Sequence, residues 1–185
     1  MAPTDRHERL SWSASAGADT VTARRRIPDR ASAEVPRMRI TKQIGHRWTD
    51  LFKLVLDMES YPAFVPHCRE VRVLSRRAGD ATKTVIVSRM TVGLAALEVS
   101  YSNRAIGDAA ARLIEVEAID GPLRYLRVVW QFNPDGDDRT EIDFSVDFEF
   151  SNLILATVAS RVFSSMFGEM VDAFERRADR LFGRQ

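Results

Sequence analysis

The sequence predicts an α+β domain in which a curved antiparallel sheet of about six to seven strands wraps around a long C-terminal helix. Apolar and polar residues alternate strictly from 140 to 150, a pattern typical of a strand with one face exposed to water. From residue 153 to about 181 the chain lacks proline. The first two-thirds of this segment are apolar over most of a helix circumference, so the helix needs partners on several sides.

The first elements of the predicted domain are short. Residues 38–43 form a candidate strand, and residues 46–57 place apolar side chains at helical spacing, which predicts an amphipathic helix. Pro62 and Pro66 then interrupt regular structure, because proline lacks the backbone N–H and disfavours helix in the residue before it. We therefore expect one or two short helices after the first strand.

Five more strands are expected before the last one, separated by the Gly, Asp, Asn and Pro clusters that favour turns. Their expected ranges are 71–74, 82–90, 97–106, 112–119 and 123–132. Leu126, Val128, Trp130 and Phe132 give the last of these an apolar face that matches the apolar face of residues 140–150. Both faces are predicted to lie against the C-terminal helix.

Composition limits the broad class. The chain has 185 residues, a formal net charge of +1 and one cysteine, which predicts one domain in a reducing compartment without a disulfide framework. No apolar run reaches the ~18 residues expected of a membrane span. Residues 1–37 are rich in Ser, Ala and Arg without periodic apolar residues, so we expect a disordered N-terminal extension, or a true start at Met38.

The residue pattern gives no catalytic or metal-binding residues. His7, His46 and His67 lack the spacing of metal ligands. Cys68 follows His67 directly, but adjacent side chains seldom converge, so Cys68 is expected to be a small buried apolar residue.

Residues 57–68, DMESYPAFVPHC, resemble the signature of the coenzyme Q-binding START-domain family, which includes mitochondrial ubiquinone chaperones and RatA-type ribosome-association toxins. Further similarity lies in RMTVG at 89–93, in DGPLRYL and WQF between 120 and 132, and in DFEF at 147–150. The resemblance covers about residues 38–183. Residues 93–97 depart from it, because they lack the aromatic residue often found there, and the N-terminal extension has no counterpart.

The resemblance implies a helix-grip fold and non-enzymatic binding of a polyprenylated quinone such as ubiquinone, without a covalent cofactor. The protein would then be a carrier or chaperone supporting respiratory electron transport, cytoplasmic and in transient contact with the inner membrane. The candidate ligand-binding residues are a proline-stiffened lip, the apolar sheet face and one side of the helix: Tyr61, Phe64, Val65, Pro66, Trp130, Phe132, Phe144, Val146, Val162, Met166 and Met170. The quinone head is expected near Tyr61 or another polar group at the rim.

Two alternatives remain open, as does the oligomeric state. A RatA-like toxin would bind the ribosome and block subunit joining, and it predicts a basic patch from Arg69, Arg72, Arg76 and Arg77. An aromatase/cyclase-type enzyme would need an acid inside the cavity, for which Glu98 and Glu117 are the candidates.

Overall fold

The computed structural model of the protein describes residues 37–80, 82–94 and 97–183, and for helix residues 153–166 it describes the backbone alone. The elements run in chain order as β1 (Arg37–Ile44), α1 (Trp48–Leu56), the 3-10 helix η1 (Met58–Ala63), β2 (Cys68–Ala78), β3 (Lys83–Leu94), β4 (Leu97–Asp108), β5 (Leu113–Asp120), β6 (Leu123–Pro134), β7 (Thr140–Phe150) and α2 (Leu153–Phe182). The predicted extension, up to residue 36, lies outside the described residues.

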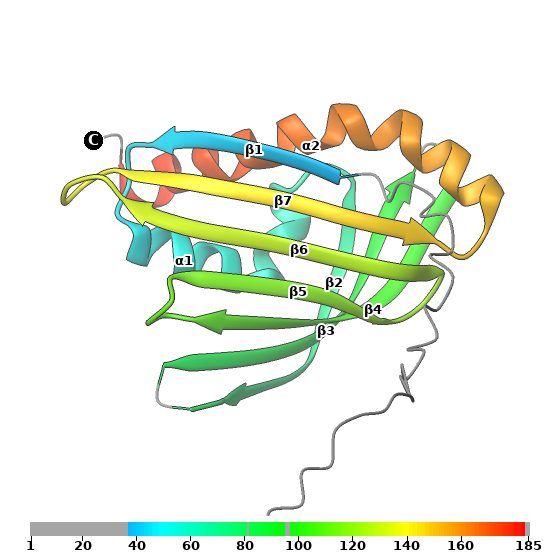
Figure 1. Ribbon diagram of the computed structural model, residues 1–185, viewed down its shortest axis with the longest axis horizontal. Coiled ribbons are helices and arrows are strands. Elements are labelled where there is room, and N and C mark those ends of the chain that lie inside the picture. Colours follow the sequence, from blue (N-terminus) through cyan, green and yellow to red (C-terminus); the bar gives the residue numbers. More distant parts are fainter. Residues whose placement is uncertain (1–36, 81, 95–96, 184–185) are drawn as a thin grey trace, which may run out of the picture. The chain divides into compact units, whose positions relative to one another are not determined.

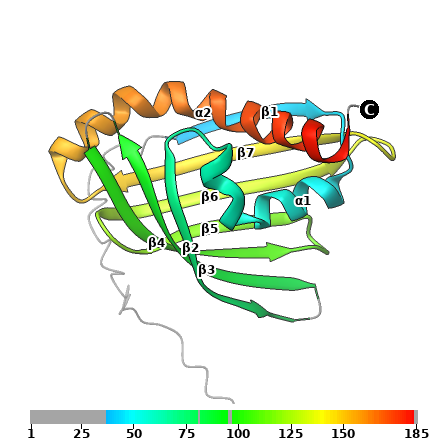
Figure 2. The same ribbon diagram turned by 180° about the vertical axis from the view of Figure 1, so that it is seen from behind.

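The seven strands form one antiparallel sheet in the order β1-β7-β6-β5-β4-β3-β2. Consecutive strands pair from β2 to β7, and β1 returns to pair with β7. The helices α1 and α2 contact each other and lie on the same face of the sheet (Figures 1 and 2). The predicted fold class, a curved antiparallel sheet around a C-terminal helix, is confirmed.

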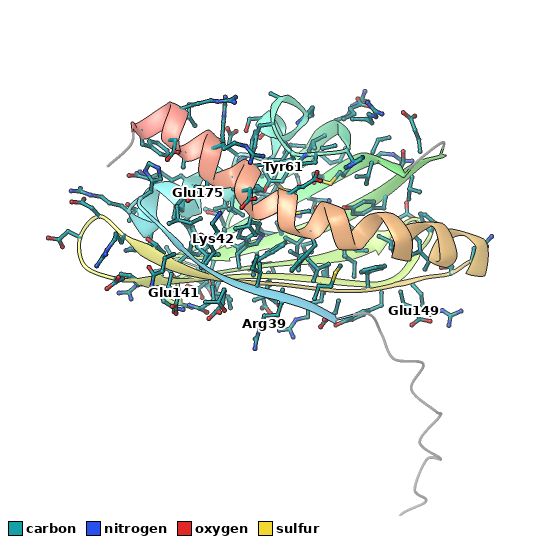
Figure 3. The ribbon with its side chains drawn as sticks, turned by 90° about the horizontal axis from the view of Figure 1, so that it is seen from above. Arg39, Lys42, Tyr61, Glu141, Glu149 and Glu175 are labelled. Atoms are coloured by element: carbon teal, nitrogen blue, oxygen red, sulfur yellow. The ribbon has the colours of Figure 1, made fainter. Side chains whose placement is uncertain are left out.

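β7 shows most clearly why these residues form a sheet. Its buried side chains are Thr140 and the five apolar residues of the predicted inner face, and they alternate with half-buried polar residues. Glu141 and Glu149 point away from α2, on the outer side of the sheet (Figure 3). The alternation thus fixes the register, since a slip of one residue would turn the acidic face into the core.

Two segments differ from the sequence prediction. Pro62 lies inside η1 rather than in an irregular segment. The strand predicted at 71–74 is much longer as β2, because it is an edge strand with irregularities between Cys68 and Glu70 and between Val73 and Ser75. Each irregularity resets the alternation of side chains, and an edge strand buries few of them, so the period-two pattern is weak.

A polar connection ties the beginning of the domain to its last helical turns. The buried His46 side chain contacts Asp179 at 2.8 Å, and the Thr140 hydroxyl donates a hydrogen bond to the His46 carbonyl at 2.7 Å. Lys42 of β1 reaches Glu175 of α2 at 2.6 Å (Figure 3). These contacts hold the C-terminal half of α2 against the sheet.

Gly121, in the turn before β6, allows a close approach of two backbones. Its φ is +117°, and a Cβ atom there would lie 2.7 Å from Cβ and 2.9 Å from Cα of Tyr101. We expect Gly121→Ala to lower the free energy of unfolding by about 2–4 kcal/mol, combining backbone strain and overpacking. Urea unfolding measures this change.

Gly136→Ala is the matched control, because Gly136 also has a positive φ (+77°) but a Cβ there would meet nothing within 4 Å. It should cost about 1 kcal/mol, the strain alone. Equal losses for the two variants would show that contact with Tyr101 is unimportant.

Candidate ligand-binding cavity

A cavity of about 130 Å³ lies between the inner face of the sheet and the C-terminal half of α2. The segment between α1 and β2 contributes Met58, Tyr61, Val65 and Pro66 to its wall, and Cys68 follows as the first residue of β2. Helix α2 contributes Met170 and Phe174, and the sheet supplies the remaining side chains. An apolar cavity of about 150 Å³ can bind benzene, so this space suits a ligand of about one ring.

The sheet wall of the cavity is built by alternation on neighbouring strands. β6 contributes Leu126, Val128 and Trp130, and β4 contributes Val99, Tyr101 and Asn103. In each strand these residues are two apart, so their side chains share the inner face. Among the described side chains, the wall is apolar apart from Asn103, the Cys68 thiol and the two tyrosines, Tyr61 and Tyr101.

Tyr61 is held by its hydroxyl, which donates a 2.5 Å hydrogen bond to the Val55 carbonyl at the end of α1. Its ring packs edge-on against Phe174 at 5.2 Å and lies beside α2 (Figure 3). Burial raises the pKa of the Tyr61 hydroxyl, so the group stays protonated. The hydroxyl that the sequence analysis offers as a polar handle thus has its proton engaged in joining η1 to α1.

The chain after η1 is fixed by backbone hydrogen bonds. His67 adopts φ 61°, and its carbonyl accepts a hydrogen bond from the Gly93 N–H at 2.8 Å. The Cys68 N–H bonds the Val65 carbonyl at 3.2 Å. The segment 61–68 therefore lies against β3 and presents Val65 and Pro66 to the cavity.

Of the eleven predicted site residues, five line the cavity: Tyr61, Val65, Pro66, Trp130 and Met170. Four others do not, namely Phe64, Phe132, Phe144 and Val146. The side chains of Val162 and Met166 lie outside the described part of the helix.

The four residues outside the lining lie in the packed core or pack against it. The Phe144 ring stacks on Phe167 at 5.0 Å, and Phe132 packs against Phe52 of α1 at 5.7 Å. Phe64 is half-buried, with the Arg177 guanidinium 5.5 Å from its ring centroid. The inner face of the sheet is longer than the cavity, so one alternating pattern supplies both core and cavity wall.

Asn103 was missed by the sequence prediction, although a signal was present. In β4 the apolar phase reads Val99, Tyr101, Asn103 and Ala105, so Asn103 is a polar residue at an inward position. Its side chain is 1% exposed, and its Oδ1 accepts a hydrogen bond from the buried Ser88 hydroxyl at 2.9 Å. The Tyr101 hydroxyl donates to the Met90 sulfur at 3.2 Å.

The described lining contains no carboxylate and no histidine. Glu98 and Glu117, the acids that a cyclase mechanism would need inside, are both exposed, and Glu117 pairs with Arg104 on the outer face. Among the described residues, no group of three or more His, Cys, Asp or Glu side chains is placed to hold a metal ion. The predicted basic patch is partly neutralised, because Arg76 pairs with Glu59 at 2.9 Å.

The Cys68 thiol is 7% exposed, and burial raises its pKa to about 11. At pH 8 about one thiol in a thousand would be ionised, against about a quarter for a free cysteine. We expect iodoacetamide to alkylate Cys68 more than about a hundredfold more slowly in the native protein than in urea, with a native rate that rises up to about pH 11. Mass spectrometry after timed quenching measures both rates. A native rate equal to the unfolded rate would mean an exposed, reactive thiol.

A curved antiparallel sheet that grips a C-terminal helix beside an apolar cavity defines the helix-grip class of ligand-binding domains. Residues 44–175 match the family described as polyketide cyclase / dehydrase and lipid transport, and the chain belongs to this family. No helix in the described part of the chain combines the length and apolar character needed to cross a membrane.

Named relatives confirm the resemblance to coenzyme Q-binding START-domain proteins. The ribosome association toxin RatA of Rickettsia prowazekii is 33% identical over 75% of this chain and 92% of its own length. The coenzyme Q-binding protein COQ10 homolog B of Xenopus laevis is 32% identical over 78% of this chain and 59% of its own length. The solved structure of the 18 kDa protein CC1736 from Caulobacter crescentus is 32% identical, with a TM-score of 0.64 over 80% of this chain and 99% of that one.

Proposed function

We propose that the cavity binds the ring of a polyprenylated quinone such as ubiquinone, and that the protein acts as a non-enzymatic carrier or chaperone. The observation that carries this proposal is the apolar, ring-sized cavity beside the segment Tyr61 to Cys68, which bears the family signature. The similarity to a relative named as coenzyme Q-binding supports the choice of ligand.

The cavity is large enough for the quinone ring and too small for the isoprenoid chain as well. Burying about 150 Å² of apolar ring surface contributes about 4 kcal/mol before the costs of association. The ring alone would therefore bind weakly, and part of the isoprenoid chain has to be buried as well for tight binding. A tail placed against Phe144 and Val146 does not fit, because those side chains are already packed in the core.

The absence of catalysis is part of the proposal and is supported by the chemistry of the lining. The titratable groups in the described lining are two tyrosines and one cysteine, and burial raises the pKa of all three. All three are neutral at pH 7, so none is poised to exchange a proton.

The direct test is to purify the protein from its native host, extract it with organic solvent and identify the lipids by mass spectrometry. The expected result is a polyprenylated quinone, enriched over the lipids recovered with an unrelated protein of similar size. If correctly folded protein, purified from cells with intact membranes, yields no quinone, a carrier function is rejected.

A ribosome-binding function is the second candidate, and one feature of the outer sheet face favours it. Arg72 of β2 and Arg89 of β3 are direct cross-strand partners, and both are exposed. Like charges directly opposite each other are destabilising in a sheet, so an anionic partner would stabilise this pair. Glu70 approaches Arg72 only to 3.6 Å.

Overexpression followed by sucrose-gradient sedimentation of ribosomes tests this candidate. A toxin-like activity predicts fewer joined ribosomes with the wild type and normal profiles with an Arg72→Glu/Arg89→Glu variant. Unchanged profiles at high expression of the wild type would reject it.

A further inference from the structure

Asn103 occupies a position where an apolar residue would be expected. It lies on the inner face of β4 between Tyr101 and Ala105, and its side chain is 1% exposed. Placing an amide in an apolar environment without hydrogen bonds costs about 1–3 kcal/mol in proteins. Apart from accepting the hydrogen bond of the Ser88 hydroxyl, the amide contributes nothing to the domain that an aliphatic residue would not supply, so its presence points to the ligand.

The Asn103 amide is oriented by a neighbouring strand. Ser88 of β3 is the direct cross-strand partner of Asn103 and is fully buried. Its hydroxyl donates to Oδ1 of Asn103 at 2.9 Å. That bond is the only one of the Asn103 side chain among the described residues, so the two N–H groups on Nδ2 have no protein acceptor there. Asn103 lines the cavity, where a bound molecule can supply one.

Tyr101 places a second donor on the same wall. It lies two residues before Asn103, on the same face of β4, and it also lines the cavity. Its hydroxyl donates to the Met90 sulfur at 3.2 Å, and a thioether is a weak acceptor. The hydroxyl can therefore turn to a better acceptor at little cost.

We propose that Asn103, oriented by Ser88 and assisted by Tyr101, recognises a carbonyl oxygen of the ligand ring and so selects quinones and cyclic ketones over hydrocarbons of equal size. This inference rests on the proposed function, because it requires that a ring enters the cavity. It places the polar end of the ligand against β3 and β4, away from the Tyr61 hydroxyl.

Two probes of the same shape separate recognition of the carbonyl from filling of the cavity. Duroquinone and durene are both tetramethyl-substituted six-membered rings, and only duroquinone carries carbonyl oxygens. The double variant Ser88→Ala/Asn103→Leu removes the donor together with its orienting partner. Replacing both partners of a buried hydrogen bond by apolar groups is close to neutral for stability, so the variant should fold.

The measurements are the affinities of both probes for the wild type and the double variant, obtained from the ligand-induced rise in Tm. We expect the ratio of duroquinone to durene affinity to fall about tenfold in the variant, the value of one lost hydrogen bond. In the wild type, the Asn103 side-chain amide resonances should shift downfield with duroquinone and stay in place with durene.

Each other outcome is decisive. If both probes bind and the ratio of their affinities is the same in the two proteins, Asn103 does not read a carbonyl, and the proposed cavity function survives. If neither probe binds the wild type, the proposed function fails and this inference fails with it.

Discussion

Replacing Val128 with phenylalanine is expected to abolish binding of ubiquinone with a single isoprene unit. Val128 lines the cavity from β6, opposite Val116 of β5, which also lines it. The larger side chain adds most of a benzene ring to a space that suits one ring. Because this ring fills existing space, the cost in stability should stay below about 3 kcal/mol. Quenching of tryptophan fluorescence by the quinone measures binding, because Trp130 is also in the wall.

Val129→Phe is the matched control. Val129 is the next residue on β6 and faces the outer side of the sheet, where it borders a depression with Arg127 and Ser145. The same substitution there should leave the quinone affinity within about twofold of the wild type, because the new ring lies on the opposite side of the sheet from the cavity. The fold should be retained as well, since surface changes rarely alter stability by more than about 0.5 kcal/mol. Equal affinities for the two variants would place the quinone outside this cavity. Loss of quenching in Trp130→Phe, which keeps Trp12 and Trp48, would assign the fluorescence signal to the cavity wall.

Phe174→Ala is expected to lower the free energy of unfolding by about 3–5 kcal/mol, the usual range for a buried phenylalanine. Phe174 is 2% exposed. Its ring lies 5.2 Å from Tyr61, 5.0 Å from Phe64 and 4.9 Å from Trp130. One side chain thus joins α2 to both the segment after α1 and the sheet. Urea unfolding followed by far-UV circular dichroism measures the change.

Phe182→Ala on the same helix is the control for this substitution. Phe182 is 40% exposed and contacts the His46 ring at 6.0 Å, so its removal should cost less than about 1.5 kcal/mol. Similar losses at both positions would mean that Phe174 does not connect the helix to the cavity wall. A variant Phe174→Leu should recover part of the lost stability, since it refills most of the space.

The position of the cavity explains how the domain can be stable and still leave space for a ligand. At one end of the sheet the aromatic rings of Phe132, Phe144 and Phe167 fill the space between sheet and helices. At the other end smaller residues such as Val99 and Val116 border the cavity. The packed end supplies the stability that the cavity end gives up through lost contacts.

The amino-acid sequence alone predicts the fold class, because the patterns that define it are local. Alternation in 140–150 fixes which face of β7 is buried, and the apolar first part of α2 requires a surrounding surface. The motif at residues 57–68 indicated the family and the neighbourhood of the cavity, where Tyr61, Val65 and Pro66 are indeed found.

Which inward-facing residues border empty space depends on how the helices pack on the sheet. Alternation places Phe144 and Val128 on the inner face alike, yet one is packed against Phe167 and the other borders the cavity. The difference depends on which part of α1 or α2 lies opposite, and strand periodicity carries no information about that. Hydrogen-bond partners distant in sequence are equally hidden: Tyr61 is engaged by Val55, and Asn103 is oriented by Ser88 across two strands. The proposed polar contact of the ligand, the Asn103 amide, therefore becomes apparent only when the pairing of β3 with β4 is known.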